Sequence, residues 1–207
     1  MGKTENKLPE KIQMVDLQRQ YHRFKEEIDE ALLGTVEQSV FINGPRVNEF
    51  ARKLADYLDV NYLIPCGNGT DALQIALMAL ELKQGDEVIV PAFTYVAAAE
   101  VIALLGLTPV WVDVDPDTFT VTSATIEEAF SSRTRAIVAV HLFGQCCDMA
   151  PILSFAAEHS LFVIEDNAQS MGAVYTFPEG FTRMAGTMGV IGTTSFFPSK
   201  PLACSGD

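Results

Sequence analysis

The feature of this sequence that most constrains its fold is an alternation between short, continuously apolar segments and helical segments. Apolar runs occupy residues 86–91, 134–142 and 161–166, and segments with helical patterning occupy residues 94–106 and 149–160. Strands that are apolar along their whole length are buried on both faces, which is typical of parallel sheets. The pattern therefore predicts an α/β fold with a mostly parallel sheet covered by helices.

The N-terminal third is predicted to begin with two helices. Residues 16–38 carry apolar side chains at three- and four-residue steps, with Asp16 as the N-cap, and a second helix is expected over residues 47–60. The breakers of the FINGPR turn separate them. The run NYLIPC at residues 61–66 is predicted to be a short strand, and residues 70–82 a helix.

Composition excludes several classes of protein. The formal net charge of -13 disfavours nucleic acid and anionic lipid as partners. Residues 1–13 form a polar tail without the apolar core of a signal peptide, and no apolar run approaches the roughly 20 residues of a membrane helix. A soluble, cytoplasmic protein is expected. The cysteines lack zinc-ligand spacing, so reduced thiols and no metal site are expected at Cys66, Cys146, Cys147 and Cys204.

Ligands of open α/β sheets bind beyond the carboxyl ends of the strands, so residues that follow the strands are the candidates. The segment CGNGTDALQIAL places Gly67 and Gly69 in a turn before a helix, with Thr70 at its start. Free amides at a helix start favour an anion, so this turn is a candidate phosphate site. The alternative is a simple turn in which Thr70 only caps the helix.

Two further strand ends carry candidates. In PAFTYVAAAE, Tyr95 lies just past a strand, where its ring could lie against an aromatic ligand or pack on the core. In VHLFGQ, His141 follows a strand and either lines the site or is a hydrogen-bonded core histidine. For both residues, the packing role is the simpler interpretation.

The segment LFVIEDNAQS ends an apolar strand with two carboxylates, Glu165 and Asp166. A carboxylate in such a place is costly unless it is paired. Asp166 would be satisfied by a protonated ring nitrogen, with Gln169 sharing the site, or it could cap the next helix.

The segment TTSFFPSKP contains one amine, Lys200, with Ser195 five residues before it. Such an amine is a candidate nucleophile, although a lone lysine often lies at the surface with its stem buried.

Taken together and in order, four motifs resemble the DegT/DnrJ/EryC1/StrS aminotransferases. The motifs are GNGTDAL, PAFTYVA, EDNAQS and TSFFPSKPL, and the stretches DLQRQY and FINGPRVNEFA fit as well. The resemblance runs from about Met14 to Asp207. It implies the aspartate-aminotransferase fold (fold type I) and pyridoxal 5'-phosphate (PLP) as cofactor. Within the family, HLFGQC and TSFFPSKPL are most similar to bacterial enzymes that aminate C3 of a UDP-linked 3-keto-N-acetylglucosaminuronic acid.

The resemblance also implies roles for individual residues. Lys200 would bond covalently to the cofactor and move the proton between its C4′ and the substrate carbon. Asp166 would pair with the pyridinium nitrogen, Tyr95 would stack on the ring, and Gln169 would lie near the 3-hydroxyl. The phosphate would be held by Gly69, Thr70, the Asp71 amide and Ser195.

Members of this family are nearly twice as long as this chain. Residues 14–207 would thus be the N-terminal portion of the large, PLP-binding domain, with the C-terminal small domain absent from this chain. The resemblance implies glutamate and a nucleotide-linked keto-sugar as substrates, a homodimer when full-length, and a role in amino-sugar or surface-polysaccharide synthesis. Sugar dehydration is disfavoured because those relatives carry histidine in place of Lys200. An inactive or binding-only fragment stays open, and a nicotinamide enzyme would need a glycine fingerprint that GNGTDAL lacks.

Overall fold

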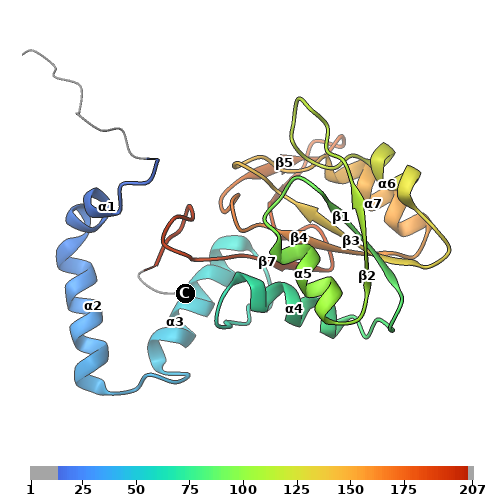
Figure 1. Ribbon diagram of the computed structural model, residues 1–207. Helices are drawn as coiled ribbons and strands as arrows, with labels where there is room; N and C mark the ends of the chain where they lie inside the picture. Colours follow the sequence, from blue (N-terminus) through green and yellow to red (C-terminus); the bar gives the residue numbers. More distant parts are fainter. Residues whose placement is uncertain (1–13, 205–207) are drawn as a thin grey trace, which may run out of the picture. The chain divides into compact units, whose positions relative to one another are not determined.

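The structure, a computed structural model, describes residues 14–204, and the chain divides into two compact units, residues 1–48 and 49–207. The second unit contains a five-stranded sheet in the order β2-β1-β3-β4-β7, and every neighbouring pair is parallel (Figure 1). The strands are β1 (Glu87–Pro91), β2 (Thr108–Val112), β3 (Thr134–Val140), β4 (Phe162–Asp166) and β7 (Ile191–Thr193). The helices of this unit after α3 are α4 (Gly69–Ala79), α5 (Ala97–Leu104), α6 (Ser123–Ala129) and α7 (Met149–Glu158). The prediction of an α/β fold with a parallel sheet is confirmed.

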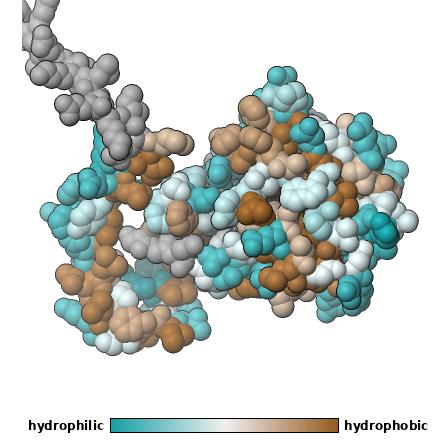
Figure 2. Space-filling model, in the orientation of Figure 1, coloured by the Kyte–Doolittle hydropathy of each residue, from teal (hydrophilic) through white to brown (hydrophobic). Residues whose placement is uncertain are grey.

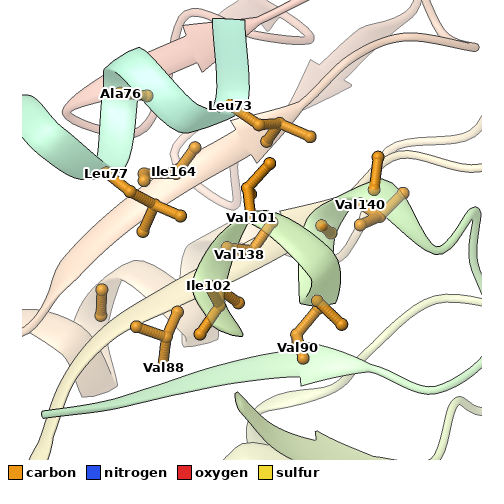
Figure 3. Close-up of a cluster of buried hydrophobic side chains, with 14 of the residues drawn as sticks. Leu73, Ala76, Leu77, Val88, Val90, Val101, Ile102, Val138, Val140 and Ile164 are labelled. Carbon is orange, nitrogen blue, oxygen red and sulfur yellow. The ribbon is translucent and has the colours of Figure 1, made fainter. Parts of the chain in front are cut away.

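Helices cover both faces of the sheet. On one face, side chains of α4 and α5 such as Leu77 and Ile102 pack against Val138 of β3 (Figure 3). On the other face, α6 and α7 pack against Ile89 and Ile137. Every residue of β1 is buried, as are all but one in β3. The apolar runs at residues 88–91 of β1 and 136–140 of β3 are thus explained by burial on two sides.

The strand order fixes where a ligand can bind. The chain runs from β1 outward to β2, then crosses back to β3 on the other side of β1 and continues to β4 and β7. The direction of winding therefore reverses between β1 and β3. The carboxyl ends of all five parallel strands meet at one edge, and the reversal opens a crevice there.

Residues 61–66, predicted to be a strand, are not one. Tyr62 and Ile64 are 87% and 79% exposed, so this short apolar run is not buried against the sheet, and Pro65 has no N–H to give to a ladder. The structure adds three short strands that were not predicted: β7 and the antiparallel hairpin of β5 (Val174–Thr176) and β6 (Thr182–Met184).

The first unit is helical where it is described. The single helix predicted over residues 16–38 is two helices, α1 (Leu17–Arg23) and α2 (Lys25–Gln38), because Phe24 leaves the helical region at φ −119°. Asp16 caps α1 as predicted, its side chain accepting from Arg19 N–H. Leu32, Leu33 and Val36 of α2 are exposed, apolar side chains show at the surface of this unit (Figure 2), and none of the residues of α2 is buried.

Helix α3 (Pro45–Leu58) confirms the second predicted helix and begins two residues earlier than expected. Proline is favoured in the first turn of a helix, where its missing N–H has no partner to lose. The predicted polar tail, residues 1–13, lies outside the described residues.

Candidate active site

A cavity of about 460 Å³ lies at the carboxyl edge of the sheet. Its walls come from the start of α4 and from the segments that follow β1, β3, β4 and β7. Seven of the eight residues expected at the cofactor site line it, namely Gly69, Thr70, Tyr95, Asp166, Gln169, Ser195 and Lys200. Residues up to 131 positions apart in the sequence, from Gly69 to Lys200, are thereby gathered around one space.

The start of α4 forms one end of the cavity. Asn68 is the N-cap, and its side-chain oxygen accepts a hydrogen bond from Asp71 N–H at 2.9 Å. The Asp71 amide, expected to hold a phosphate, is thus already engaged, and Asp71 does not line the cavity. Within the described chain, the amides of Gly69 and Thr70 have no hydrogen-bond partner, so they are the free donors at this helix start.

Gly69 and Ser195 approach each other closely across this end of the cavity. A Cβ atom placed on Gly69 would lie 2.7 Å from Ser195 Cβ and 3.3 Å from its hydroxyl oxygen. Only glycine lets the helix start come so near to the segment after β7. The result is a small polar cradle made of two free amides and one hydroxyl, which suits an anion.

Asp166 ends β4 and faces the cavity. Burial raises the pKa of its carboxyl above the ordinary value, while the Ala168 amide and the nearby Lys200 and His141 act in the opposite direction. One carboxylate oxygen accepts from Ala168 N–H at 3.0 Å. The residues that follow form turns before β5, so Asp166 does not cap a helix, which was the alternative interpretation. No other hydrogen bond to this carboxylate is found among residues 14–204, which leaves its second oxygen free to bind a cationic group.

Lys200 and Tyr95 complete the cavity. Lys200 lies in a turn closed by its own N–H, which donates to Phe197 carbonyl oxygen at 2.8 Å. Its amine shares the cavity with Asp166. Tyr95 is 72% exposed, so its ring is available to a ligand and is not packed into the core.

A buried pair behind the cavity was not predicted. His141 and Glu165 are both fully buried, and His141 Nε2 lies 2.8 Å from a Glu165 carboxylate oxygen. His141 is therefore the hydrogen-bonded core histidine of the simpler interpretation, although it also contributes to the cavity wall. The two residues are 24 positions apart, so no local spacing indicates the contact. Asn68 was also not predicted to be the N-cap of α4, although an Asn before a helix is a recognisable cap signal. The hydrogen-bond partners of Glu165 were not predicted either.

Other kinds of site receive no support from the described chain. Residues 14–204 contain no group of three or more His, Cys, Asp or Glu side chains that could hold a metal ion. No disulfide bond is formed among residues 14–204, and burial raises the pKa of Cys146 to about 11 and of Cys147 to about 12. None of the described helices is long and apolar enough to cross a membrane.

Comparison with known proteins adds an independent line of evidence. The family model of the DegT/DnrJ/EryC1/StrS aminotransferases matches residues 22–207. The UDP-2-acetamido-2-deoxy-3-oxo-D-glucuronate aminotransferase of Pseudomonas aeruginosa is 46% identical over 196 residues, which cover 95% of this chain and 53% of that protein.

Solved structures agree with this match. DesV of S. venezuelae, solved with a ketimine intermediate, superimposes with a TM-score of 0.89 at 35% identity, covering 95% of this chain and 52% of that one. NtdA of Bacillus subtilis, solved with bound cofactor PMP, gives a TM-score of 0.87 at 34% identity, covering 97% and 44%. The chain spans about half the length of the curated relatives it matches.

Proposed function

Since this chain belongs to the DegT/DnrJ/EryC1/StrS aminotransferase family, we propose that it provides the cofactor-binding part of a PLP-dependent sugar aminotransferase. The enzyme would transfer an amino group from glutamate to a nucleotide-linked keto-sugar. One observation carries the proposal: a single cavity holds an amine, a carboxylate and an anion cradle, contributed by Lys200, Asp166 and the Gly69–Ser195 pair.

The residues present fit PLP in charge and chemistry. The cradle of the Gly69 and Thr70 amides and the Ser195 hydroxyl fits the phosphate, and the missing Cβ of Gly69 is what lets these groups lie so close together. The free oxygen of Asp166 fits the ring nitrogen. Tyr95 offers an exposed ring face, and Gln169 an amide for the 3-hydroxyl.

Each residue then has one physical task. The bound cofactor supplies an electron sink for the substrate carbanion. Asp166 holds the ring-nitrogen proton by charge, a task for which a buried carboxylate is well suited because little water competes with it. Lys200 would hold the cofactor through its amine and would carry the proton to and from the substrate carbon. Ser195 and the α4 amides would hold the phosphate.

The substrate class follows from the relatives. The match to the Pseudomonas aeruginosa aminotransferase, at 46% identity, supports a UDP-linked 3-keto sugar as the amino acceptor. The full-length enzyme would be a cytoplasmic homodimer serving amino-sugar or surface-polysaccharide biosynthesis.

Borohydride reduction in the presence of PLP tests the core of this proposal. The chain is incubated with PLP, reduced, digested and analysed by mass spectrometry. The expected result is one phosphopyridoxyl group on Lys200, lost in Lys200→Ala. Equal labelling of exposed lysines such as Lys53 and Lys83, or no labelling at all, would show that this chain holds no competent cofactor site and support a binding-only or inactive fragment.

A further inference from the structure

Glu165 lies next to Asp166 but faces the other side of the sheet. Successive residues of a strand point to opposite faces, and Ile164 belongs to the cluster under α4 and α5 whereas Val163 belongs to the cluster under α6 and α7. Asp166 thus shares the face of Ile164 and reaches the cavity. Glu165 shares the face of Val163 and is fully buried. The mechanism proposed above makes no use of it.

The Glu165 carboxylate has four hydrogen-bond donors. One oxygen accepts from His141 Nε2 and Gly186 N–H, each at 2.8 Å. The other accepts from Met188 N–H and Gly189 N–H, each at 2.5 Å. Three main-chain amides of one turn and one imidazole therefore donate to a single buried carboxylate, and both carboxylate oxygens are satisfied.

The tautomer of His141 is fixed by its second partner. Cys147 N–H donates to His141 Nδ1 at 3.1 Å, so Nδ1 is an acceptor and the ring proton lies on Nε2, toward Glu165. Every partner of the carboxylate is consequently a donor. A glutamine at position 165 would therefore place its NH2 group against hydrogen-bond donors only. His141 could accept from that NH2 group only in its other tautomer, which would lose the hydrogen bond from Cys147 N–H.

The turn held by Glu165 is pressed onto the sheet. A Cβ on Gly189 would lie 2.4 Å from Val163 carbonyl oxygen, and one on Gly192 would lie 1.9 Å from Gly186 carbonyl oxygen. Glycines at every third position thus let the turn fold directly against β4 and β7. This segment, which precedes β7 in the chain, has no room to shift while the carboxylate holds it.

β7 is a weak strand by itself. It has three residues and, within the described chain, pairs only with β4, where Thr193 lies opposite Asp166. The Thr193 hydroxyl adds one bond to Glu165 carbonyl oxygen at 3.2 Å. The segment with Ser195 and Lys200 begins directly after this strand. Backbone bonds from Val190 N–H to Val163 carbonyl oxygen at 2.9 Å and from Asn167 N–H to Thr193 carbonyl oxygen at 2.8 Å frame the strand. With so few bonds, its register relative to Asp166 is sensitive to what anchors the turn before β7.

We propose that Glu165 is a positioning residue for the cofactor site. By fixing the turn at residues 186–189, its carboxylate sets the register of β7, and thereby the positions of Ser195 and Lys200 relative to Asp166. The inference rests on the proposed function, because it concerns where those three groups meet PLP. Glu165 itself does not line the cavity.

The test compares Glu165→Gln with a matched variant, Glu87→Gln. Glu87 is also buried and is bound by Ser131 and Arg133, but it begins β1 and lies at the opposite edge of the sheet. Two quantities are measured in the 207-residue chain: the dissociation constant for PLP by equilibrium dialysis, and the yield of phosphopyridoxyl-Lys200 after reduction at saturating PLP. Melting temperature without PLP is recorded for each variant.

Glu165→Gln is expected to weaken PLP binding at least tenfold and to lower the Lys200 yield even at saturation. Glu87→Gln is expected to lower the melting temperature while leaving both cofactor readouts unchanged. Unchanged readouts in Glu165→Gln, or equal losses in the two variants, would overturn the positioning role. Absence of labelling in the unsubstituted chain would instead overturn the proposed function, and this inference with it.

A double variant at Glu165 and Ser195 distinguishes a positioning role from a general loss of stability. If Glu165 acts by placing Ser195, the fold-losses in PLP affinity from Glu165→Gln and Ser195→Ala should multiply to more than the loss in the double variant. If the two losses multiply independently, the proposal is overturned.

Should Glu165→Gln fail to fold, Glu165→Asp decides. It keeps the negative charge but shortens the side chain, so the carboxylate can no longer reach His141 and the amides of the turn together. A threefold or greater loss of PLP affinity is expected, whereas unchanged affinity would overturn the proposal.

Discussion

Replacing Gly69 by Ala should damage the anion cradle much more than the fold. The added Cβ would stand 2.7 Å from Ser195 Cβ, and both atoms are attached rigidly to the backbone. Carbon atoms are in favourable contact at about 3.5 Å, so the helix start and the Ser195 segment must separate by about 0.8 Å. No side-chain rotation can relieve this contact.

The cost in stability should be modest. Forcing an extra methyl group into a packed site costs about 1–3 kcal/mol. Reduced freedom of the unfolded chain returns about 0.4–1 kcal/mol when glycine becomes alanine at a position with an ordinary backbone, and Gly69 does not have positive φ. The net loss should be about 1 kcal/mol, which urea unfolding followed by circular dichroism can resolve.

The cost in cofactor affinity should be larger. Hydrogen bonds to a charged group contribute about 1.5–3 kcal/mol each, and a shift of about 0.8 Å weakens those from the α4 amides or from Ser195. Every 1.4 kcal/mol is about tenfold in affinity, so the dissociation constant for PLP should rise by about ten- to a hundredfold. Equilibrium dialysis of the folded variant measures it.

Gly34→Ala is the control for this substitution. Gly34 lies inside α2, and the atom nearest to an added Cβ is 3.9 Å away in the Arg46 side chain, so the methyl group fits. Removing a mid-helix glycine should stabilise the chain by roughly 0.5–1 kcal/mol without changing PLP binding. If Gly69→Ala is folded and binds PLP as tightly as the unsubstituted chain, the close approach of Gly69 and Ser195 does not shape the phosphate site.

Three further predictions concern charge and reactivity. Lys200→Ala should abolish phosphopyridoxyl labelling while leaving urea unfolding nearly unchanged; residual labelling above a few per cent of the unsubstituted level would refute the assignment. The pKa of Asp166 is raised in the folded chain. Ionisation of this carboxyl therefore lowers the free energy of unfolding as pH rises above about 3.9, the pKa of an Asp in the unfolded chain. Asp166→Asn should therefore stabilise the PLP-free chain at pH 7 but not at pH 3.5, and should weaken PLP binding; equal unfolding curves at pH 7 would contradict the burial argument. Iodoacetamide at pH 8 should modify the exposed Cys66 well before Cys147, whose pKa of about 12 leaves almost no thiolate; equal rates of modification would refute this order.

The sequence was sufficient for the fold class because burial on two faces leaves an unambiguous pattern. β1 and β3 are apolar over most of their length, and such strands are typical of a sheet between two layers of helices. The same pattern located the site, since residues that follow such strands, among them Asp166 and Tyr95, gather at one edge of a parallel sheet. Seven expected residues lie on one cavity for this reason, although their roles toward the cofactor stay predictions.

The features that could not be predicted from the sequence depend on which segments lie next to one another in the fold. β7 has three residues, too few for a periodic signal, and it is a strand because β4 offers it a partner. Residues 61–66 have an apolar run as good as that of β7, yet no strand among residues 14–204 pairs with them. The hydrogen bond from the Asp71 amide to Asn68 is likewise invisible in composition, because an N-cap uses the same kind of N–H group that a phosphate could bind.

The last two residues of β4 show how one strand can serve structure and chemistry together. Both are acids, and both leave water on folding, which is costly for a carboxylate without partners. Glu165 meets four donors on its face of the sheet, so its charge is satisfied within the protein and holds the turn before β7. Asp166, on the opposite face, has one hydrogen-bond donor among residues 14–204 and a raised pKa, so a bound cation would satisfy the free carboxylate oxygen. The two-residue period of the strand therefore separates the acid that we propose to build the site from the acid that we propose to act in it.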